Sequence, residues 1–336
     1  MMLYPLKFTP RLFHKLWGGQ HIRQWYDNVP SDFLNVGESW LISAVEKYPT
    51  EVCNGPLAGN ELEDLLEVYM DELVGESVYE RFGNMFPLLL KFIDADDDLS
   101  IQVHPNDEQA FEMENSMGKT EMWYVMPSEP EASVIAGWKT QMDEQQIRDA
   151  IDHGSLNDHL VVRPVKEGDV VMINAGLVHA LNRGTIVAEI QENSDITYRL
   201  YDYDRVGNDG KKRPLKLQQA LQVLNYDKAD PTAVSHAQVS VNQAVNAVTT
   251  DYFTTNVIHF DKPIARDYAP LDSFVAYMCV QGACVIEAPE ADPAEQQQTL
   301  QLGQAILLPA VLNDITLTPT NGPCKLLEIY INKIED

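Results

Sequence analysis

The chain has 336 residues, of which 45% are hydrophobic and 22% charged, the mix of a folded globular protein with a substantial core. Its 51 acidic and 24 basic side chains give a formal net charge of -27, which argues against nucleic acid or an anionic membrane surface as partner. An anionic small molecule therefore needs Lys and Arg side chains at close range, because salt screens the overall field over about 8–10 Å.

The amino-terminal residues 1–10 do not read as a signal peptide, and no run of about 18 apolar residues predicts a membrane span. The four cysteines include no CxxC pair, so we expect reduced and mostly buried thiols. These features favour a cytoplasmic protein.

Apolar and β-branched runs predict short strands along most of the chain, among them 170–173, 186–190, 274–280 and 305–308. Helical periodicity is confined to 61–82, 142–151 and 214–224. Many strands with few helices predict a mainly β fold, a barrel or sandwich that carries helical insertions.

A weak internal repeat suggests two copies of one β-barrel. Gly168 and Gly303 each precede an apolar strand of five residues that ends at an asparagine or a proline, and a second strand with a glutamate follows. The polar tract 227–250 is the expected boundary. We therefore expect a catalytic, metal-binding barrel with helical segments at 1–235 and a degenerate, metal-free barrel at 240–336.

The segment 99–105 alternates between polar and apolar side chains. In a strand, Ser100, Gln102 and His104 share one face, while apolar residues occupy the other. A glutamine and a histidine two residues apart can both reach one ion. An exposed edge strand gives the same pattern, so this segment alone does not decide between them.

The segment 168–179 resembles the second motif of the cupin barrels, with a glycine, a buried strand, a turn and a histidine in order. Asn174 stands where proline is usual, which a turn tolerates. The turn directs the histidine toward the barrel interior, and a glutamate opens the strand 121–125. The four predicted ligands suit Zn²⁺ and tolerate Mn²⁺ or Co²⁺. They are Gln102, His104, Glu121 and His179.

The odd-numbered positions from 189 to 199 form a polar series. If this stretch is one extended strand, Asp195 and Arg199 lie on the same face as Glu189. Lys119, two residues before Glu121, is expected on the same side as that ligand. Lys119 and Arg199 supply the local positive charge that an anionic substrate requires. A solvated surface shows the same periodicity.

Six short stretches carry a more specific resemblance: LWGG at 16–19, GESW at 37–40, FPLLLKF at 86–92, LSIQVHP at 99–105, GKTE at 118–121 and NSDITYR at 193–199. Together they resemble type I mannose-6-phosphate isomerase of the short bacterial class, a cupin family. The resemblance spans the chain to about residue 230 and implies two cupin-type, jelly-roll barrels with a few inserted helices.

The resemblance also implies the roles of individual residues. It implies that the four predicted ligands hold the metal, and it assigns Arg199 and Lys119 to catalysis with the acidic Glu189 and Asp195. It implies that Trp17 and Lys91 lie near the sugar. Longer members of the family have a histidine and a tyrosine where this chain has Gly118 and Leu181. Neither position can therefore supply the proton-transfer base here.

The activity implied is interconversion of mannose 6-phosphate and fructose 6-phosphate through a cis-enediol, aided by a metal acting as a Lewis acid. Glu189 and Asp195 are the candidate bases. Two alternatives are a cupin oxygenase that uses iron and a sugar-sensing protein without catalysis. The expected partner is a small sugar phosphate, and the sequence says nothing of the oligomeric state.

The carboxy-terminal copy lacks the ligand set. Asp314 replaces the metal histidine in the repeat, and His259 is the only histidine after His236. The apolar residues at 306–308, 311 and 312 predict packing, so this barrel is expected to support the first one.

Overall fold

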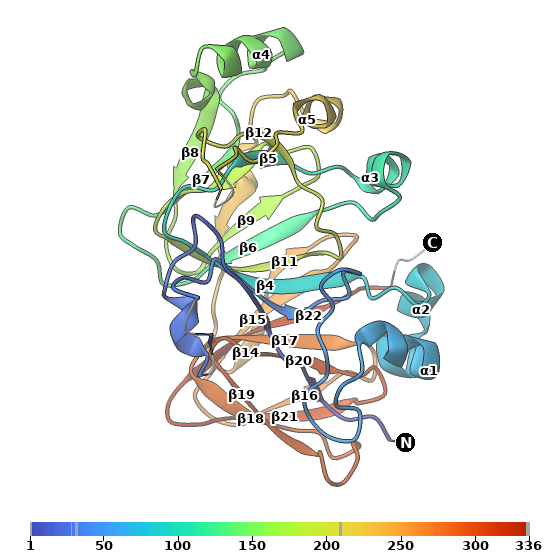
Figure 1. Ribbon diagram of the computed structural model, residues 1–336. Helices are drawn as coiled ribbons and strands as arrows, with labels where there is room; N and C mark the ends of the chain where they lie inside the picture. The colour runs from blue at the N-terminus through green and yellow to red at the C-terminus, as the bar shows by residue number, and fades with distance from the viewer. Residues whose placement is uncertain (1, 28, 31–32, 208–209, 334–336) are drawn as a thin grey trace. The chain divides into compact units, whose positions relative to one another are not determined.

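The computed structural model describes residues 2–27, 29–30, 33–207 and 210–333, and it confirms a mainly β protein (Figure 1). The chain forms two compact units. Unit 1 comprises Met1–Arg11, Trp40–Lys91 and Ala237–Asp336, and unit 2 comprises Leu12–Ser39 and Phe92–His236. Within the described part of the chain, no helix has the length and apolarity needed to cross a bilayer.

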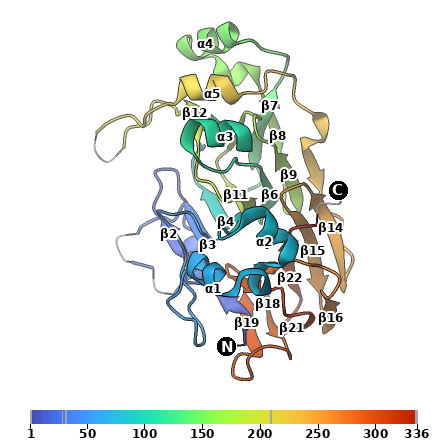
Figure 2. The same cartoon turned by 90° about the vertical axis from the view of Figure 1, so that its right-hand side faces the viewer.

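Unit 2 contains a five-stranded sheet. Its strands, in spatial order, are β12 (Tyr198–Tyr201), β5 (Ile101–Val103), β10 (His179–Leu181), β7 (Ser133–Trp138) and β8 (Leu160–Pro164). The helices that pack on it are α3 (Asp107–Glu114), α4 (Glu144–Asp152) and α5 (Leu217–Val223). Figure 2 shows these three helices near β7 and β12 of this sheet.

The opposing strands of unit 2 belong to a second, seven-stranded sheet. Its order is β13 (Val234–His236), β9 (Asp169–Ile173), β6 (Glu121–Val125), β11 (Thr185–Glu192), β4 (Leu88–Ala95), β3 (Glu38–Ile42) and β2 (Arg11–Phe13). In this sheet β2, β3 and β4 each contain residues of both units. Short 3₁₀ turns lie at Ile22–Trp25, Leu156–His159 and Pro231–Ala233.

Side-chain alternation explains how unit 2 builds both a core and a site. Ile101 and Val103 pack with the helices, whereas the intervening Gln102 faces the other way, beside His179. On that second face Val134 and Leu181 join a separate core with residues of β6, β9 and β11, among them Val125. The expected alternation is confirmed within β5, whereas Leu99, expected on the face of Ile101 and Val103, packs in the second core.

Unit 1 contains two sheets and two helices. The six-stranded sheet has the order β1 (Leu6–Lys7), β20 (Ala305–Leu308), β17 (Val275–Gln281), β22 (Cys324–Tyr330), β15 (Thr254–Phe260) and β14 (Gln243–Thr249). The four-stranded sheet has the order β16 (Ile264–Asp267), β21 (Asp314–Pro319), β18 (Ala283–Glu287) and β19 (Gln297–Gln301). The helices are α1 (Leu62–Val74) and α2 (Glu76–Phe82). Hydrogen bonding among the described strands leaves these four sheets separate, without barrel closure.

The two units do not follow the expected linear division. The chain enters its last segment of unit 1 at Ala237, close to the expected boundary, but Met1–Arg11 and Trp40–Lys91 also belong to unit 1. Strand pairing gives the reason, because Leu6 of β1 lies opposite Leu307 of β20. A short amino-terminal strand thereby completes a sheet made of residues far away in sequence.

The single helix expected at 61–82 is two helices. Gly75 separates them with a φ of 93°, and a Cβ at this position would lie 2.5 Å from the Asp272 carbonyl oxygen. The Asp272 carboxylate then accepts hydrogen bonds from Glu76 N at 2.7 Å and Ser77 N at 3.1 Å, which caps α2. The helices expected at 142–151 and 214–224 are confirmed as α4 and α5.

The internal repeat is visible in the strand order. Gly168 and Gly303 both have positive φ, 86° and 87°, and lead into β9 and β20. In one sheet β9 neighbours β6 and then β11, and in another β20 neighbours β17 and then β22. The glutamates of the repeat, Glu189 and Glu328, are both buried.

The sequence suggested an apolar interior for this region, but the interior of unit 1 also contains buried polar side chains. Residues at 306–308 and 312 are buried, but Val311 is exposed. Buried Glu328 accepts hydrogen bonds from Arg266 Nε at 2.9 Å and Asn256 Nδ2 at 2.7 Å, and also from Tyr268. A satisfied polar network thus replaces apolar packing at this point.

Candidate metal centre

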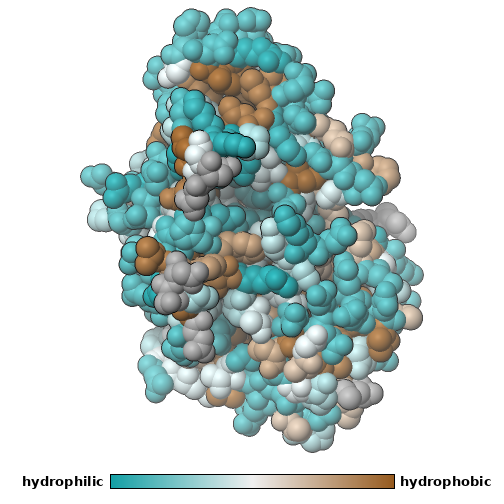
Figure 3. All heavy atoms as spheres, in the orientation of Figure 1, coloured by the Kyte–Doolittle hydropathy of each residue, from teal (hydrophilic) through white to brown (hydrophobic). Residues whose placement is uncertain are grey.

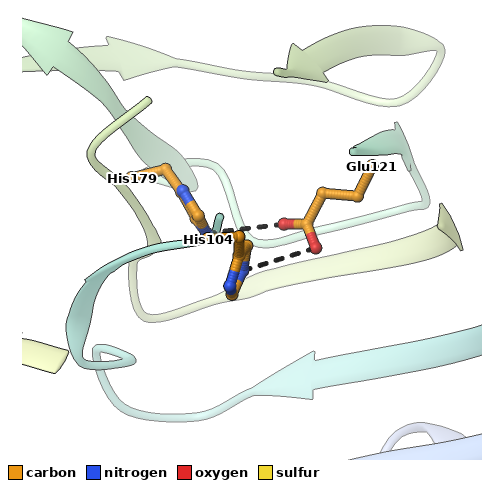
Figure 4. Close-up of side chains that lie close together, drawn as sticks. All are labelled: His104, Glu121 and His179. Atoms are coloured by element: carbon orange, nitrogen blue, oxygen red, sulfur yellow. Dashed lines mark ion pairs between the residues drawn. The ribbon is translucent and has the colours of Figure 1, made fainter. Parts of the chain in front are cut away.

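Three ionisable side chains meet in the interior of unit 2. His104 follows β5, Glu121 opens β6 and His179 opens β10, and all three are buried. Both imidazoles point to the Glu121 carboxylate (Figure 4), with His104 Nε2 3.6 Å from Oε2 and His179 Nε2 3.4 Å from Oε1. The available ligand atoms of this cluster all lie within 4.8 Å of one another.

Strand register explains why these side chains converge. His179 lies opposite Gln102, and Gln102 lies opposite Arg199 on its other side, so the three form one row across the five-stranded sheet. Directly opposite residues in antiparallel strands point to the same face. In the other sheet Glu121 lies between Ile173 and Gln191 in the same manner.

The protonation of His179 suits a ligand. Its Nδ1 lies 2.8 Å from the Leu177 carbonyl oxygen, which can only accept, so Nδ1 carries the proton. The pKa of His179 is lowered to about 3, chiefly by burial and also by the nearby Lys119 ammonium, against the raising effect of the Leu177 hydrogen bond. The ring is therefore neutral, with the Nε2 lone pair directed at the cluster.

Gln102 lies at the edge of this cluster. Its Nε2 is 3.3 Å from His179 Nε2, and its Oε1 accepts a hydrogen bond of 3.2 Å from Ser100. The amide is half-buried, whereas the other three predicted ligands are buried. The structure thus brings all four predicted ligands together.

The cationic residues expected near the cluster are present. Lys119 is buried, with its ammonium 3.4 Å from Glu121 Oε2. Arg199 is half-buried in the row of Gln102 and His179. Burial lowers the pKa of Arg199, and the Arg213 guanidinium adds to this effect. These two cations supply positive charge inside a strongly acidic chain.

The two candidate bases differ in position. Glu189 is buried opposite Trp123, whose indole donates a hydrogen bond of 2.6 Å to Glu189 Oε2. Asp195 is exposed, because β11 ends at Glu192 and β12 begins only at Tyr198. Residues 189–199 therefore do not form one extended strand, which was the condition for placing Asp195 on the face of Glu189.

The two residues expected near the sugar lie in different parts of the chain. Trp17 is buried in unit 2 and belongs to the same core as Trp123. Lys91 is buried on β4 at the end of a unit 1 segment, with Nζ 5.7 Å from the centre of the Trp40 ring. Gly118 and Leu181, which replace ionisable residues of longer relatives, offer no titratable side chain.

Sequence reasoning gave no role to Gln191, which the structure places beside Glu121. The polar series from 189 to 199 includes this residue, but periodicity alone could not show whether its side chain is buried near the site or exposed to solvent.

The fold and the cluster define a mainly β protein with a candidate site for one metal ion. A model of the phosphomannose isomerase type I catalytic domain matches residues 6–141. Mannose-6-phosphate isomerase of Streptococcus mutans is 32% identical over 340 residues, which cover 99% of this chain and 100% of that protein. Mannose-6-phosphate isomerase ManA of Bacillus subtilis is 36% identical over 256 residues, 76% of this chain and 79% of that protein.

The solved structures agree with this. The crystal structure of the mannose 6-phosphate isomerase from Bacillus subtilis matches with a TM-score of 0.84 and 30% identity, covering 98% of this chain and 100% of that one. The chain therefore belongs to the type I mannose-6-phosphate isomerase family, as its motifs predicted.

Proposed function

We propose that this protein is an aldose–ketose isomerase that interconverts mannose 6-phosphate and fructose 6-phosphate. Membership of the family supports the substrate and the reaction. The observation that carries the proposal is the buried cluster of His104, Glu121 and His179, which has the composition of a catalytic metal site.

The residues of this cluster fit a divalent cation. Two imidazole nitrogens and a carboxylate are ligands that Zn²⁺ takes, and here His179 Nε2 lies 3.4 Å from Glu121 Oε1 and His104 Nε2 lies 3.6 Å from Oε2. We propose that His104, Glu121 and His179, with Gln102 as the fourth ligand, hold one Zn²⁺, or Mn²⁺ or Co²⁺. When bound, such a cation polarises a substrate oxygen as a Lewis acid.

The protein's own residues then bind and orient the sugar phosphate. Arg199 and Lys119 offer charge-assisted hydrogen bonds to the substrate's anionic oxygens, which include the oxygen of a cis-enediolate and those of the phosphate. Trp17 and Lys91 are proposed to contact the sugar phosphate as well.

A proton must move between C1 and C2 of the sugar. Of the two candidate bases, Glu189 lies buried on the strand next to that of Glu121, and the Trp123 indole orients its carboxylate. Asp195 is exposed in the link between β11 and β12. We propose Glu189 as the first candidate and keep Asp195 as the second.

We further propose that residues 1–235 carry the chemistry and that 240–336 form a metal-free supporting region, each built on a cupin-type barrel. The repeated strand order around β9 and β20 supports this. A small sugar phosphate is the proposed partner, with no role for nucleic acid or membrane. We also propose that the protein is located in the cytoplasm.

On the face shown in Figure 3, hydrophilic residues predominate, in keeping with the acidic composition.

The experiment is a coupled assay of fructose 6-phosphate formation from mannose 6-phosphate, run beside metal analysis. We expect turnover with about one equivalent of metal per chain and reversible loss of activity on chelation. Stoichiometric metal without turnover would refute the proposal and favour a sugar sensor. Oxygen uptake with bound iron would instead identify an oxygenase.

A further inference from the structure

Gln191 is a buried polar residue that has no assigned role, although its strand position is directly opposite a residue of the candidate metal centre. It lies near the end of β11, directly opposite Glu121 of β6, and its side chain therefore shares the inner face with that ligand. The Gln191 side chain is fully buried. An amide in this position must be explained by what it binds, because an unpaired polar group in the interior is costly.

The orientation of the Gln191 amide is determined by two hydrogen bonds. Nε2 donates to the Glu192 carbonyl oxygen at 2.8 Å and to the Ser194 carbonyl oxygen at 2.6 Å. Both partners only accept, so both hydrogens of Nε2 are used and the nitrogen cannot exchange places with the oxygen.

The Gln191 amide oxygen has a different environment. Among the described residues no donor lies within hydrogen-bonding distance of Oε1, although the atom is buried. Oε1 is therefore a buried acceptor that the fixed amide holds in place. In the other sheet, Arg199 Nε, in the row of Gln102 and His179, is likewise a buried donor without an acceptor among those residues.

The surroundings select the chemistry of the ligand group. Phosphate and carboxylate groups offer only acceptors, and the Glu121 and Glu189 carboxylates on the same inner face repel them. A neutral hydroxyl donates a hydrogen bond and carries no charge. A polyhydroxy chain also offers acceptors to a donor such as Arg199 Nε.

We propose that Gln191 Oε1 accepts a hydrogen bond from a hydroxyl group of the substrate's sugar chain, which makes Gln191 a substrate-positioning residue. This rests on the proposed function for the identity of the sugar. In that reaction the oxygens on C1 and C2 belong to the reacting centre beside the metal ligands. The hydroxyl on C5 lies next to the carbon that carries the phosphate, which Glu121 and Glu189 repel, so we assign the partner of Gln191 to the hydroxyl on C3 or C4.

The test compares wild type with Gln191→Met, which keeps the side-chain length but removes the amide. Each protein is assayed with mannose 6-phosphate and with its 3-deoxy and 4-deoxy analogues. With mannose 6-phosphate we expect kcat/KM to fall about 3–10-fold, the effect of one neutral hydrogen bond. With the analogue that lacks the partner hydroxyl, the same substitution should have little further effect.

This non-additivity separates positioning from general damage. Gln191→Met also removes the hydrogen bonds that Nε2 donates to the Glu192 and Ser194 carbonyl oxygens. If this only loosens the turn, kcat/KM should fall by the same factor with all three substrates. Equal losses with all three substrates would therefore overturn the proposal, as would unchanged kinetics. Gln145→Met, at an exposed position of α4, is the matched control and should behave as wild type.

A second measurement separates this proposal from the proposed function. If metal-loaded wild type fails to turn over mannose 6-phosphate, the isomerase activity is refuted. Calorimetric binding of mannitol 1-phosphate, an acyclic polyol phosphate, then decides the role of Gln191. Binding about 3–10-fold weaker in Gln191→Met supports the hydroxyl contact, whereas equal affinity, or no binding by either protein, overturns it.

Discussion

Glu192 gives the sharpest prediction about stability. This buried carboxyl group ends β11, and its Oε1 accepts a hydrogen bond of 2.6 Å from Thr120 N, immediately before the ligand strand β6. The pKa of Glu192 is raised from 4.5 to about 8, chiefly by burial and then by the Asp107 carboxylate, while the Thr120 hydrogen bonds oppose the rise.

The direction of the pH effect follows from these values. Between about pH 5 and pH 8 the folded protein keeps a proton on Glu192, whereas the unfolded chain has lost it. The folded state then binds more protons, so the free energy of unfolding falls as pH rises through this window. The slope approaches about 1.4 kcal/mol per pH unit, which amounts to about 2–4 kcal/mol over the window.

Glu192→Gln removes the titration and keeps an amide oxygen for Thr120 N. Urea unfolding of wild type and variant at pH 5, 6, 7 and 8 should show a difference in free energy that grows with pH in favour of the variant. All other titrating groups cancel in this difference. Glu112→Gln, at an exposed position of α3, is the control and should run parallel to wild type. Parallel curves for wild type and Glu192→Gln would refute the reasoning.

Three further predictions concern the site and the second unit. His179→Ala should reduce bound metal to well below one equivalent and abolish turnover while the fold persists, as measured by metal analysis and circular dichroism; full activity after exhaustive chelation contradicts the assignment. Arg199→Lys should lower kcat by about tenfold or more with little change in KM, because lysine loses the planar fork; wild-type kinetics would return Arg199 to a solvated role. Asp314→Ala, in an exposed position at the start of β21, should leave metal content and turnover unchanged; loss of a second bound ion would show that this region binds metal.

Strand alternation and local motifs were enough to predict the residues of the buried cluster. Gln102 and His104 stand two residues apart in an alternating segment, and the glycine-to-histidine spacing of 168–179 marks a buried strand followed by a turn. These are short-range properties, since the geometry of a few consecutive residues decides which face a side chain occupies. The cluster that the structure shows was therefore predictable from its parts.

Longer-range features were not predictable in this way. The periodicity of 61–82 continues through Gly75, but only the close approach of Asp272 shows why the helix breaks there. The polar series from 189 to 199 reads as one strand, yet the chain leaves the sheet after Glu192 and exposes Asp195. Contacts between distant segments decided both outcomes.

By itself, the sequence was enough to predict the strand-rich class, the buried cluster of His104, Glu121 and His179, the positive charge of Lys119 beside it and the family, because these depend on residue type and short spacing. Only the tertiary structure decided that the short strand β1 belongs to a sheet of unit 1, through pairing of Leu6 with Leu307. It alone gave Gln191 its place opposite Glu121 and left its amide oxygen as a buried acceptor. The physical reason is strand register, which depends on hydrogen bonds between segments far apart in the chain and not on the residues within either segment.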